Sequence, residues 1–307
     1  MTLPGATIAE RQVVDQAKRL LRAYSAEYRR AKKCRTVRAL GAIAFAIAGP
    51  VTAVWSMTAA TYIAAAAGTW VVIVRVLLKR YESEAQRHAV AIHELYDDEV
   101  LGLPWPDSLA GPKPAEEDIS KAARRVETDE DLTARIDAGW FAPTPGVPPP
   151  VDALICQRAS AVWGRRQHQL YARLVLWALG TAILTVVVLG LALGMSLSTW
   201  LIVFVLPGLP ALLDGVELSQ AHSEQSKRKR TIETAIDEAW NKELLHRGTL
   251  TVHRCREIQD AVFRIRMEPV QIPEWYYNRH RDNDEDAMQS AASALSERYR
   301  ASHGTTG

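Results

Sequence analysis

LVLWALGTAILTVVVLGLALGMSLSTWLIVFVLPGLPALL, residues 174–213, runs for 40 residues without an Asp, Glu, Lys, Arg or His. One membrane-spanning helix needs about 20 predominantly apolar residues, so this stretch is long enough for two. GMSLS, residues 194–198, supplies small and turn-forming residues where the chain has to reverse. The alternative is a helical hairpin buried in the core of a large soluble protein.

A second stretch of the same kind decides between these alternatives. Residues 39–74 contain no charged residue and no His over 36 residues, which is again enough for two short spans and a tight turn. We therefore predict an all-α membrane protein with four transmembrane helices, arranged as two hairpins at 39–78 and 173–216. The whole-chain averages, 23% charged residues and a mean hydropathy of −0.10, hide this pattern because the rest of the chain is strongly polar.

Basic residues crowd the outer ends of both hairpins, whereas the two connecting turns carry no charge. The flanking basic residues are Arg29, Arg30, Lys32, Lys33, Arg35, Arg38, Lys79, Arg80, Arg165, Arg166, Arg173, Lys227, Arg228, Lys229 and Arg230. The positive-inside rule therefore places both termini and the segment between the hairpins in the cytoplasm. Trp55 and Trp200 lie beside the turns, where tryptophans anchor helices at the membrane interface.

The polar segments outside the hairpins, 1–38, 79–172 and 217–307, carry apolar residues at helical spacing. We expect the three segments to assemble into one composite helical cytoplasmic domain. In the first segment, the apolar stripe is close to a heptad pattern, so it packs either on the protein's own domain or on a second copy. The stripe consists of Val14, Ala17, Leu21, Tyr24, Tyr28 and Ala31.

PTPGVPPP, residues 143–150, is expected to be a stiff extended connector.

Four residues near the inner membrane boundary are candidates for a pore or a gate. Arg75 either extends to the lipid headgroups or lines a water-filled path. Pro207 and Pro210 free backbone carbonyls in the fourth span, and these carbonyls need helix neighbours or water as partners. Asp214 is either an ordinary interfacial carboxylate or part of a pore mouth. Four spans are few for a channel within one chain, so a pore would require a homo-oligomer in the lipid bilayer.

A cationic and aromatic segment near the C terminus is the candidate ligand site. Its residues are Arg254, Arg264, Arg266, Trp275, Tyr276 and Arg279. Guanidinium groups suit phosphate and aromatic rings stack on bases, so this composition favours an anionic or nucleotide ligand. We expect no direct binding of nucleic acid. The alternative is that the arginines form a solvated helix face and pair with Glu257, Asp260 and Glu268.

The sequence contains none of the common catalytic motifs. A Walker loop, GxSxG, HExxH and a dinucleotide-binding fingerprint are all absent. Cys34, Cys156 and Cys255 lie far apart without the spacing of a metal site, and we expect them to be reduced thiols. We therefore expect no enzymatic activity, no cofactor and no metal. An intramembrane enzyme is the weakest alternative, because no catalytic pair lies in the spans.

Five stretches of this chain resemble landmarks of the SMODS-associated four-transmembrane effector family. They are ELYDDEVLGLPWPD (94–107), PAEEDISKAARR (114–125), CQRASAVWGRR (156–166), REIQDAVFRIR (256–266) and PEWYYNRHRDNDEDAM (273–288). The resemblance runs from about Tyr96 to the C-terminal helix. LGLPW, IQDAVFRIR and PEWYY are specific in combination, and each is weak alone.

The resemblance implies a pore-forming effector of a bacterial conflict system, located as a multi-pass protein in the bacterial inner membrane. Such effectors act with a nucleotidyltransferase that makes a cyclic-oligonucleotide second messenger on phage infection. Opening of the membrane would then kill or arrest the infected cell. The alternative function is a membrane-anchored sensor or scaffold whose spans never conduct.

Overall fold

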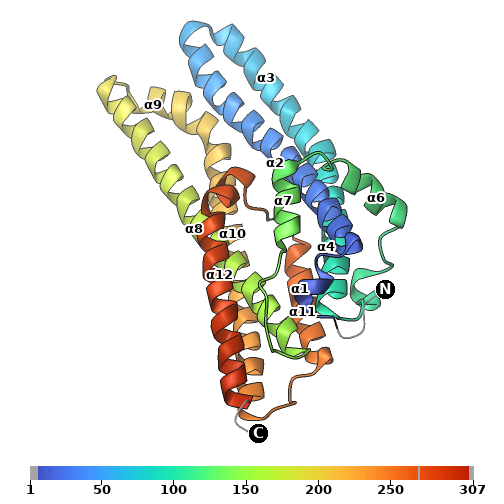
Figure 1. The fold of residues 1–307 in the computed structure, drawn as a ribbon. Helices are drawn as coiled ribbons and strands as arrows, with labels where there is room; N and C mark the ends of the chain where they lie inside the picture. Colours follow the sequence, from blue (N-terminus) through green and yellow to red (C-terminus); the bar gives the residue numbers. More distant parts are fainter. Residues whose placement is uncertain (1–5, 269, 304–307) are drawn as a thin grey trace.

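The computed structural model describes residues 6–268 and 270–303, and all regular elements in this part of the chain are helices (Figure 1). In chain order they are α1 Ile8–Arg11, α2 Asp15–Trp55, α3 Met57–Ile73, η1 Val74–Leu78, α4 Lys79–Leu101, α5 Asp107–Ala110, α6 Glu116–Arg124, α7 Glu130–Ala138, α8 Val151–Ala192, α9 Leu197–Trp200, η2 Leu201–Val205, α10 Leu206–Leu245, α11 Val252–Arg266 and α12 Glu274–His303. Side chains at 50, 53, 54, 57, 60, 75, 202, 203, 206, 207, 210 and 281–284 lie outside the described part. The all-α prediction is confirmed for the residues described.

Two helical hairpins extend from one end of the molecule and diverge from each other (Figure 1). One is formed by α2 and α3, and the other by α8 with α9, η2 and α10. In each hairpin, a tryptophan lies against a glycine of the other helix. A Cβ at Gly41 would overlap the Trp70 ring, and a Cβ at Gly190 would overlap the Trp200 ring. Glycine at these two positions therefore allows close approach of the paired helices.

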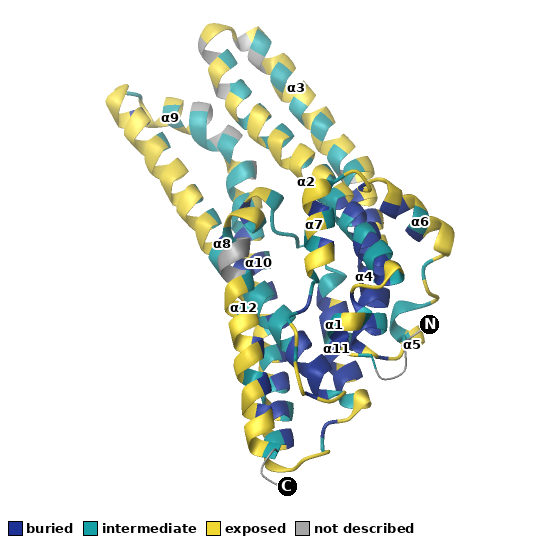
Figure 2. Cartoon of the chain, viewed as in Figure 1, coloured by how far each residue is buried: buried dark blue, intermediate teal, exposed yellow. Residues whose placement is uncertain are grey.

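The hairpins expose apolar side chains over their outer faces (Figure 2). Leu40, Leu184 and Leu191 are 61%, 63% and 78% exposed. Two helical segments, Thr61–Leu101 and Val151–Ala192, are long and apolar enough to cross a membrane, and 0% and 6% of their most apolar windows are buried. A soluble protein would bury such faces in its core, so their exposure favours lipid as their surroundings. The existence of four spans stays a prediction.

Below the hairpins, helices from all three polar segments share one hydrophobic core. Its members include Leu20, Tyr24, Tyr96, Leu154, Ile236, Trp240, Ile258 and Tyr299, from α2, α4, α8, α10, α11 and α12. The N-terminal stripe packs into this core, because Ala17, Leu21 and Ala31 are buried where α2 contacts α4 and α6. Most of the stripe therefore packs on the protein's own domain, while Val14 at its N-terminal end is 38% exposed.

The proline-rich connection between α7 and α8 is not extended throughout, which corrects the expectation for residues 143–150. The Val147 N–H donates to the Thr144 carbonyl at 3.3 Å, forming a turn. Gly146 has φ +74°, a conformation that glycine adopts readily. The turn buries the Val147 side chain in the core, and this burial favours the turn over a straight proline helix.

The LGLPW stretch ends α4 and redirects the chain. Gly102 has φ +72° and caps the helix in the left-handed conformation. A Cβ at Gly102 would lie 2.7 Å from Arg11 Nη1, which is the movable end of a flexible side chain, so the positive φ is the main reason for glycine here. The turn brings the Pro104 carbonyl to Arg256 of α11, whose Nη1 donates to it at 3.1 Å.

Candidate ligand site

A cavity of about 300 Å³ lies in the polar helical bundle, close to where both hairpins begin. Its walls come from α2, α4, α7, α8, α10, the end of α11 and residues 270–277. Lys32 of α2 lines the cavity seven residues before the first charge-free stretch, which is roughly 10 Å of helix. Since α2, α8 and α10 are long helices that belong to both the bundle and the hairpins (Figure 1), a ligand here would contact helices that continue into the hairpins.

The cavity is strongly cationic. Its cationic side chains are Arg29, Lys32, Arg135, Lys229 and Arg266. Among the lining residues that the structure describes, Glu274 is the one carboxylate. An excess of positive charge in a concave site raises the local concentration of anions. The site therefore fits an anionic ligand.

Two lysines in this wall, Lys32 and Lys229, form no ion pair with any residue that the structure describes. Lys32 Nζ lies 5.5 Å from the centroid of the Tyr277 ring. Lys229 lies across Gly164, where a Cβ would be 2.7 Å from its Nζ. Burial lowers the pKa of both lysines, that of Lys229 to about 8. The nearby Glu274 charge partly offsets this effect for Lys32. A desolvated ammonium group that forms no ion pair is unfavourable, and a bound anion would relieve that cost.

Aromatic rings form much of the remaining wall. The Trp163 ring centroid lies 6.0 Å from that of Trp140 and 5.3 Å from that of Tyr277. Tyr24 stacks on His93 with centroids 4.2 Å apart. Burial lowers the pKa of His93 to about 3, so its imidazole is neutral at physiological pH. Rings placed beside cationic groups are the combination that binds a base and its phosphate.

Arg266 connects the cavity to a buried ionic network between α4 and α11. Its Nη1 donates to Asp97 Oδ2 at 2.6 Å, and Gln259 Nε2 donates to the same oxygen at 2.8 Å. Burial by itself would raise the pKa of Asp97, but the Arg266 charge and hydrogen bond hold that pKa below its ordinary value. Asp97 therefore remains a carboxylate and fixes the position of the Arg266 guanidinium group.

Arg256 is the centre of the other half of this network. Its guanidinium group donates to Glu94, Asp98 and Asp260. Burial and the nearby Glu94 charge raise the pKa of Asp98 to about 8, and burial raises the pKa of Glu94. The carboxyl groups outnumber the two arginines, so the network retains a proton near neutral pH. Its contacts tie ELYDDEVLGLPW to REIQDAVFRIR and make these stretches a structural unit.

The structure brings only one of the six sequence-predicted ligand residues, Arg266, to the cavity wall. The five that do not line it are Arg254, Arg264, Trp275, Tyr276 and Arg279. Arg254 Nη1 pairs with Glu257 at 2.8 Å, as the solvated-face alternative expects. Positions two apart on a helix point about 200° away from each other, so 254 and 264 face away from 256 and 266. Tyr276 is buried against Tyr171, with centroids 5.2 Å apart, and Trp275 is 61% exposed.

The candidate pore residues stay a prediction. The side chains of Arg75, Pro207 and Pro210 lie outside the described part of the chain. Asp214 is exposed on α10. Residue 75 lies within the π-helical segment η1, and the π-helical segment η2 ends two residues before position 207. Such segments interrupt the regular hydrogen bonding of an α-helix.

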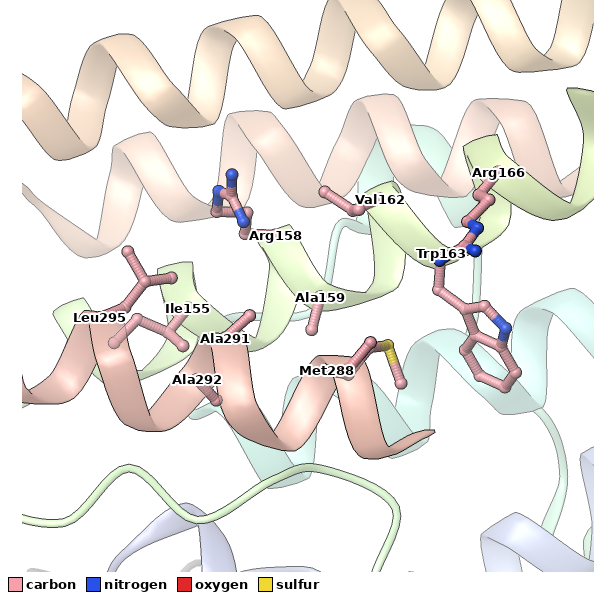
Figure 3. A pocket seen from close by; sticks show the side chains of 11 residues that line it. Ile155, Arg158, Ala159, Val162, Trp163, Arg166, Met288, Ala291, Ala292 and Leu295 are labelled. Atoms are coloured by element: carbon pink, nitrogen blue, oxygen red, sulfur yellow. The ribbon is translucent and has the colours of Figure 1, made fainter. Parts of the chain in front are cut away.

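A second cavity, of about 80 Å³, lies between α8 and α12 (Figure 3). Figure 3 shows Met288 and Ala291 of α12 beside Ile155 and Ala159 of α8. The space would hold only a few water molecules, and most of its wall is apolar. It is a packing gap rather than a ligand site.

Several cavity residues were not recognised as ligand residues in the sequence. Lys32 and Lys229 belong to the basic flanks that topology already explains, and Trp163 and Tyr277 belong to stretches far apart in the chain. A signal was present, since WGRR (163–166) also places an aromatic ring beside cations. Among the described residues, no group of three His, Cys, Asp or Glu side chains could hold a metal, and the three cysteines are free.

Comparisons with known proteins bear on the whole chain. The profile of the SMODS-associating 4TM effector domain matches residues 6–295. A protein of Bacillus cereus (strain VD146), named "Probable CBASS effector molecule", is 23% identical over 198 residues, which is 64% of this chain and 65% of that relative. The chain thus matches just under two thirds of the relative's length. No solved structure matches this fold.

Proposed function

The chain belongs to the SMODS-associating 4TM effector family, and we propose that it is a membrane effector of bacterial antiphage defence that a cyclic-oligonucleotide second messenger activates. The binding site in this proposal is the 300 Å³ cavity. The observation that carries the proposal is the pair of desolvated lysines, Lys32 and Lys229, which form no ion pair among the described residues and lie among aromatic rings at the roots of both hairpins.

The chemistry of the cavity favours a nucleotide over a simple anion. A phosphodiester carries one negative charge, which an ammonium group can neutralise in a charge-assisted hydrogen bond. The rings of Trp140, Trp163 and Tyr277 would add stacking of about 1–3 kcal/mol per base. The volume lies at the lower end of the range of small-molecule sites, about 300–1,000 Å³. These features support a ligand with both a base and a phosphate.

Binding at this place would act on the hairpins through the helices that carry the lysines. Lys32 lies on α2, which continues into the first hairpin, and Lys229 lies on α10, which descends from the second. A phosphodiester that contacts both lysines, or two phosphodiesters of one cyclic oligonucleotide that contact one lysine each, would link α2 to α10. The ligand would thereby stabilise one arrangement of these two helices over the others.

The output that we propose is membrane opening by an oligomer. One chain with four spans is too small for a roomy channel, so several copies would contribute hairpins to one pore. The candidate gate residues are Arg75, Pro207, Pro210 and Asp214, near the inner boundary of the membrane. We also propose that the protein acts by binding and conformational change rather than by catalysis, with both termini in the cytoplasm. The second candidate function is a sensor or scaffold that does not conduct.

The test uses the full chain reconstituted in liposomes that contain a self-quenched dye. Cyclic dinucleotides and cyclic trinucleotides are added separately, and dye release and nucleotide binding are both measured. The test variant Lys32→Gln/Lys229→Gln removes both cavity ammonium groups. The matched control Lys33→Gln/Lys242→Gln removes two exposed lysines from the same two helices. We expect an activating nucleotide to release dye from wild type and control.

The double cavity variant should bind the nucleotide much more weakly. Each charge-assisted contact contributes about 1.5–3 kcal/mol, so each lost lysine should weaken binding at least about tenfold. Equal binding by the test and control variants would place the ligand elsewhere. Nucleotide binding without dye release or ion current would refute the pore and favour the scaffold.

A further inference from the structure

A third cavity, of about 280 Å³, lies between α8 and α10 on the cytoplasmic side of the second hairpin. Three cationic side chains line it, namely Arg173 of α8 and Lys227 and Arg230 of α10. Ser223 and Ser226 add two hydroxyl groups to the same wall. Its composition and its place in the fold differ from those of the nucleotide cavity.

The charge balance of this third cavity is one-sided. No Asp or Glu is among the lining residues described, and the three cations form no ion pair with any residue that the structure describes. Arg228, in the same stretch of α10, instead pairs with both Glu224 and Glu268. Lys227 and Arg230 are therefore the members of this basic run that remain available to an external anion. Hydroxyl groups beside them can donate to phosphate oxygens.

The cavity lies where the chain changes from polar to apolar. Arg173 is the last charged residue before the 40-residue charge-free stretch. Leu176 also lines the cavity, and the neighbouring Trp177 is 78% exposed, as an interfacial tryptophan would be. Above this level the α8 surface is exposed and apolar (Figure 2). A bound molecule would therefore meet cations at one end and an apolar helix surface at the other.

The helix pair that forms the cavity is held together by buried polar contacts. Ser219 Oγ donates to the Ala172 carbonyl at 3.1 Å, and the Nδ1 atoms of His168 and His222 lie 2.8 Å apart. Burial lowers the pKa of both histidines, so they remain neutral and do not contribute charge to the site. These contacts keep α8 and α10 in a fixed pairing next to the cations.

We propose that this cavity binds the phosphate headgroup of an anionic phospholipid of the cytoplasmic leaflet. The phosphate would accept hydrogen bonds from Arg173, Lys227 and Arg230, and the acyl chains would follow the α8 surface from Leu176. Basic cavities between helices at the cytoplasmic side of a membrane suit anionic headgroups. The lipid would bridge α8 and α10 and so hold the second hairpin at a defined depth. This inference rests on membrane insertion and does not depend on the nucleotide site.

The test is native mass spectrometry of the purified full chain in detergent, with phosphatidylglycerol or phosphatidylcholine added at equal concentrations. Phosphatidylglycerol should bind wild type at least tenfold more tightly than phosphatidylcholine. The variant Arg173→Gln/Lys227→Gln/Arg230→Gln should lose this preference, with phosphatidylglycerol affinity lowered roughly 100-fold at about fivefold per charge. The control Lys121→Gln/Arg124→Gln/Lys242→Gln makes the same charge change on exposed positions of α6 and α10 and should bind as wild type does.

Two further measurements keep the result interpretable. The single variant Arg173→Gln should show a partial loss of affinity that Arg173→Lys restores, which a general folding defect would not do. Millimolar inorganic phosphate should fail to displace phosphatidylglycerol, because it lacks the acyl chains that contact α8. Displacement by inorganic phosphate, equal binding of the two lipids, or unchanged binding by the triple variant would each overturn the proposal.

Discussion

Replacing Arg256 with Met should strongly destabilise the polar helical bundle. The Arg256 guanidinium group is buried and donates to three carboxyl groups and to the Pro104 carbonyl. Met fills a similar volume but supplies no donor, so Glu94 and Asp98 would remain buried without their cation. Removing one partner of a buried ion pair costs about 3–5 kcal/mol. At about 2 °C per kcal/mol for a chain of this size, the thermal midpoint should fall by roughly 6–10 °C.

The matched control is Arg254→Met, the same substitution two residues earlier on α11. Arg254 forms an ion pair with Glu257 on the solvated face, where such pairs contribute about 0–1 kcal/mol. Both variants are compared with wild type by thermal unfolding in detergent at pH 5.5 and pH 8. The loss in Arg256→Met should be smaller at pH 5.5, because protonation neutralises the carboxyl groups left unpaired. Equal midpoints for the two variants would refute the structural role assigned to the network.

Four other predictions concern pH, topology and conduction. Between pH 3.8, its ordinary pKa, and about pH 8, Asp98 keeps its proton in the folded protein but releases it in the unfolded chain, so the free energy of unfolding falls as pH rises through that window. The variant Asp98→Asn should therefore show a flatter dependence of the unfolding free energy on pH between pH 5 and 8. An unchanged slope would contradict this. The affinity of the wild-type protein for the nucleotide should fall between pH 7 and 9, because Lys229, with a pKa of about 8, loses its charge there. The variant Lys229→Arg keeps its charge over this range, so its affinity should change little with pH. A reporter fused at Ser196 should face the outside and one fused at the C terminus the cytoplasm; both on one side would reject four spans. If Asp214 forms a pore mouth, Asp214→Lys should shift the ion selectivity of activated protein towards anions in a planar bilayer, and unchanged selectivity would leave Asp214 as an interfacial carboxylate.

Local patterns predicted the features of this fold that depend on neighbouring residues. The length of a charge-free stretch can be counted without knowing how the rest of the chain folds. The helical spacing of Ala17, Leu21 and Ala31 correctly indicated one buried helix face. The resemblance read from five short stretches is confirmed, because the family profile covers residues 6–295. The structure also gives two of those stretches a physical reason, since ELYDDEVLGLPW and REIQDAVFRIR hold each other through the network of Arg256 and Arg266.

The candidate ligand site depends on packing between distant segments, and the sequence therefore predicted it poorly. Arg254, Arg264 and Arg266 are close in the chain, but helical geometry sends the first two to the outer face and only Arg266 to the cavity. The aromatic residues of the cavity come instead from α2, α8, α12 and the loop after α7. Spacing along one segment cannot reveal such a combination, because it is created by the way seven helices meet.

The cations of the cavity are not equivalent, and the difference indicates where a phosphate would bind. Arg266 already donates to Asp97 at 2.6 Å, and Arg29 already pairs with Asp129, so a ligand would have to share or replace those partners. Lys32 and Lys229 form no such pair within the described chain, and burial already disfavours their charged forms. Phosphate groups therefore gain most by contacting these two lysines. Because Lys32 lies on α2 and Lys229 on α10, such contacts would join the helix that carries the start of the first charge-free stretch to the helix that carries the end of the second.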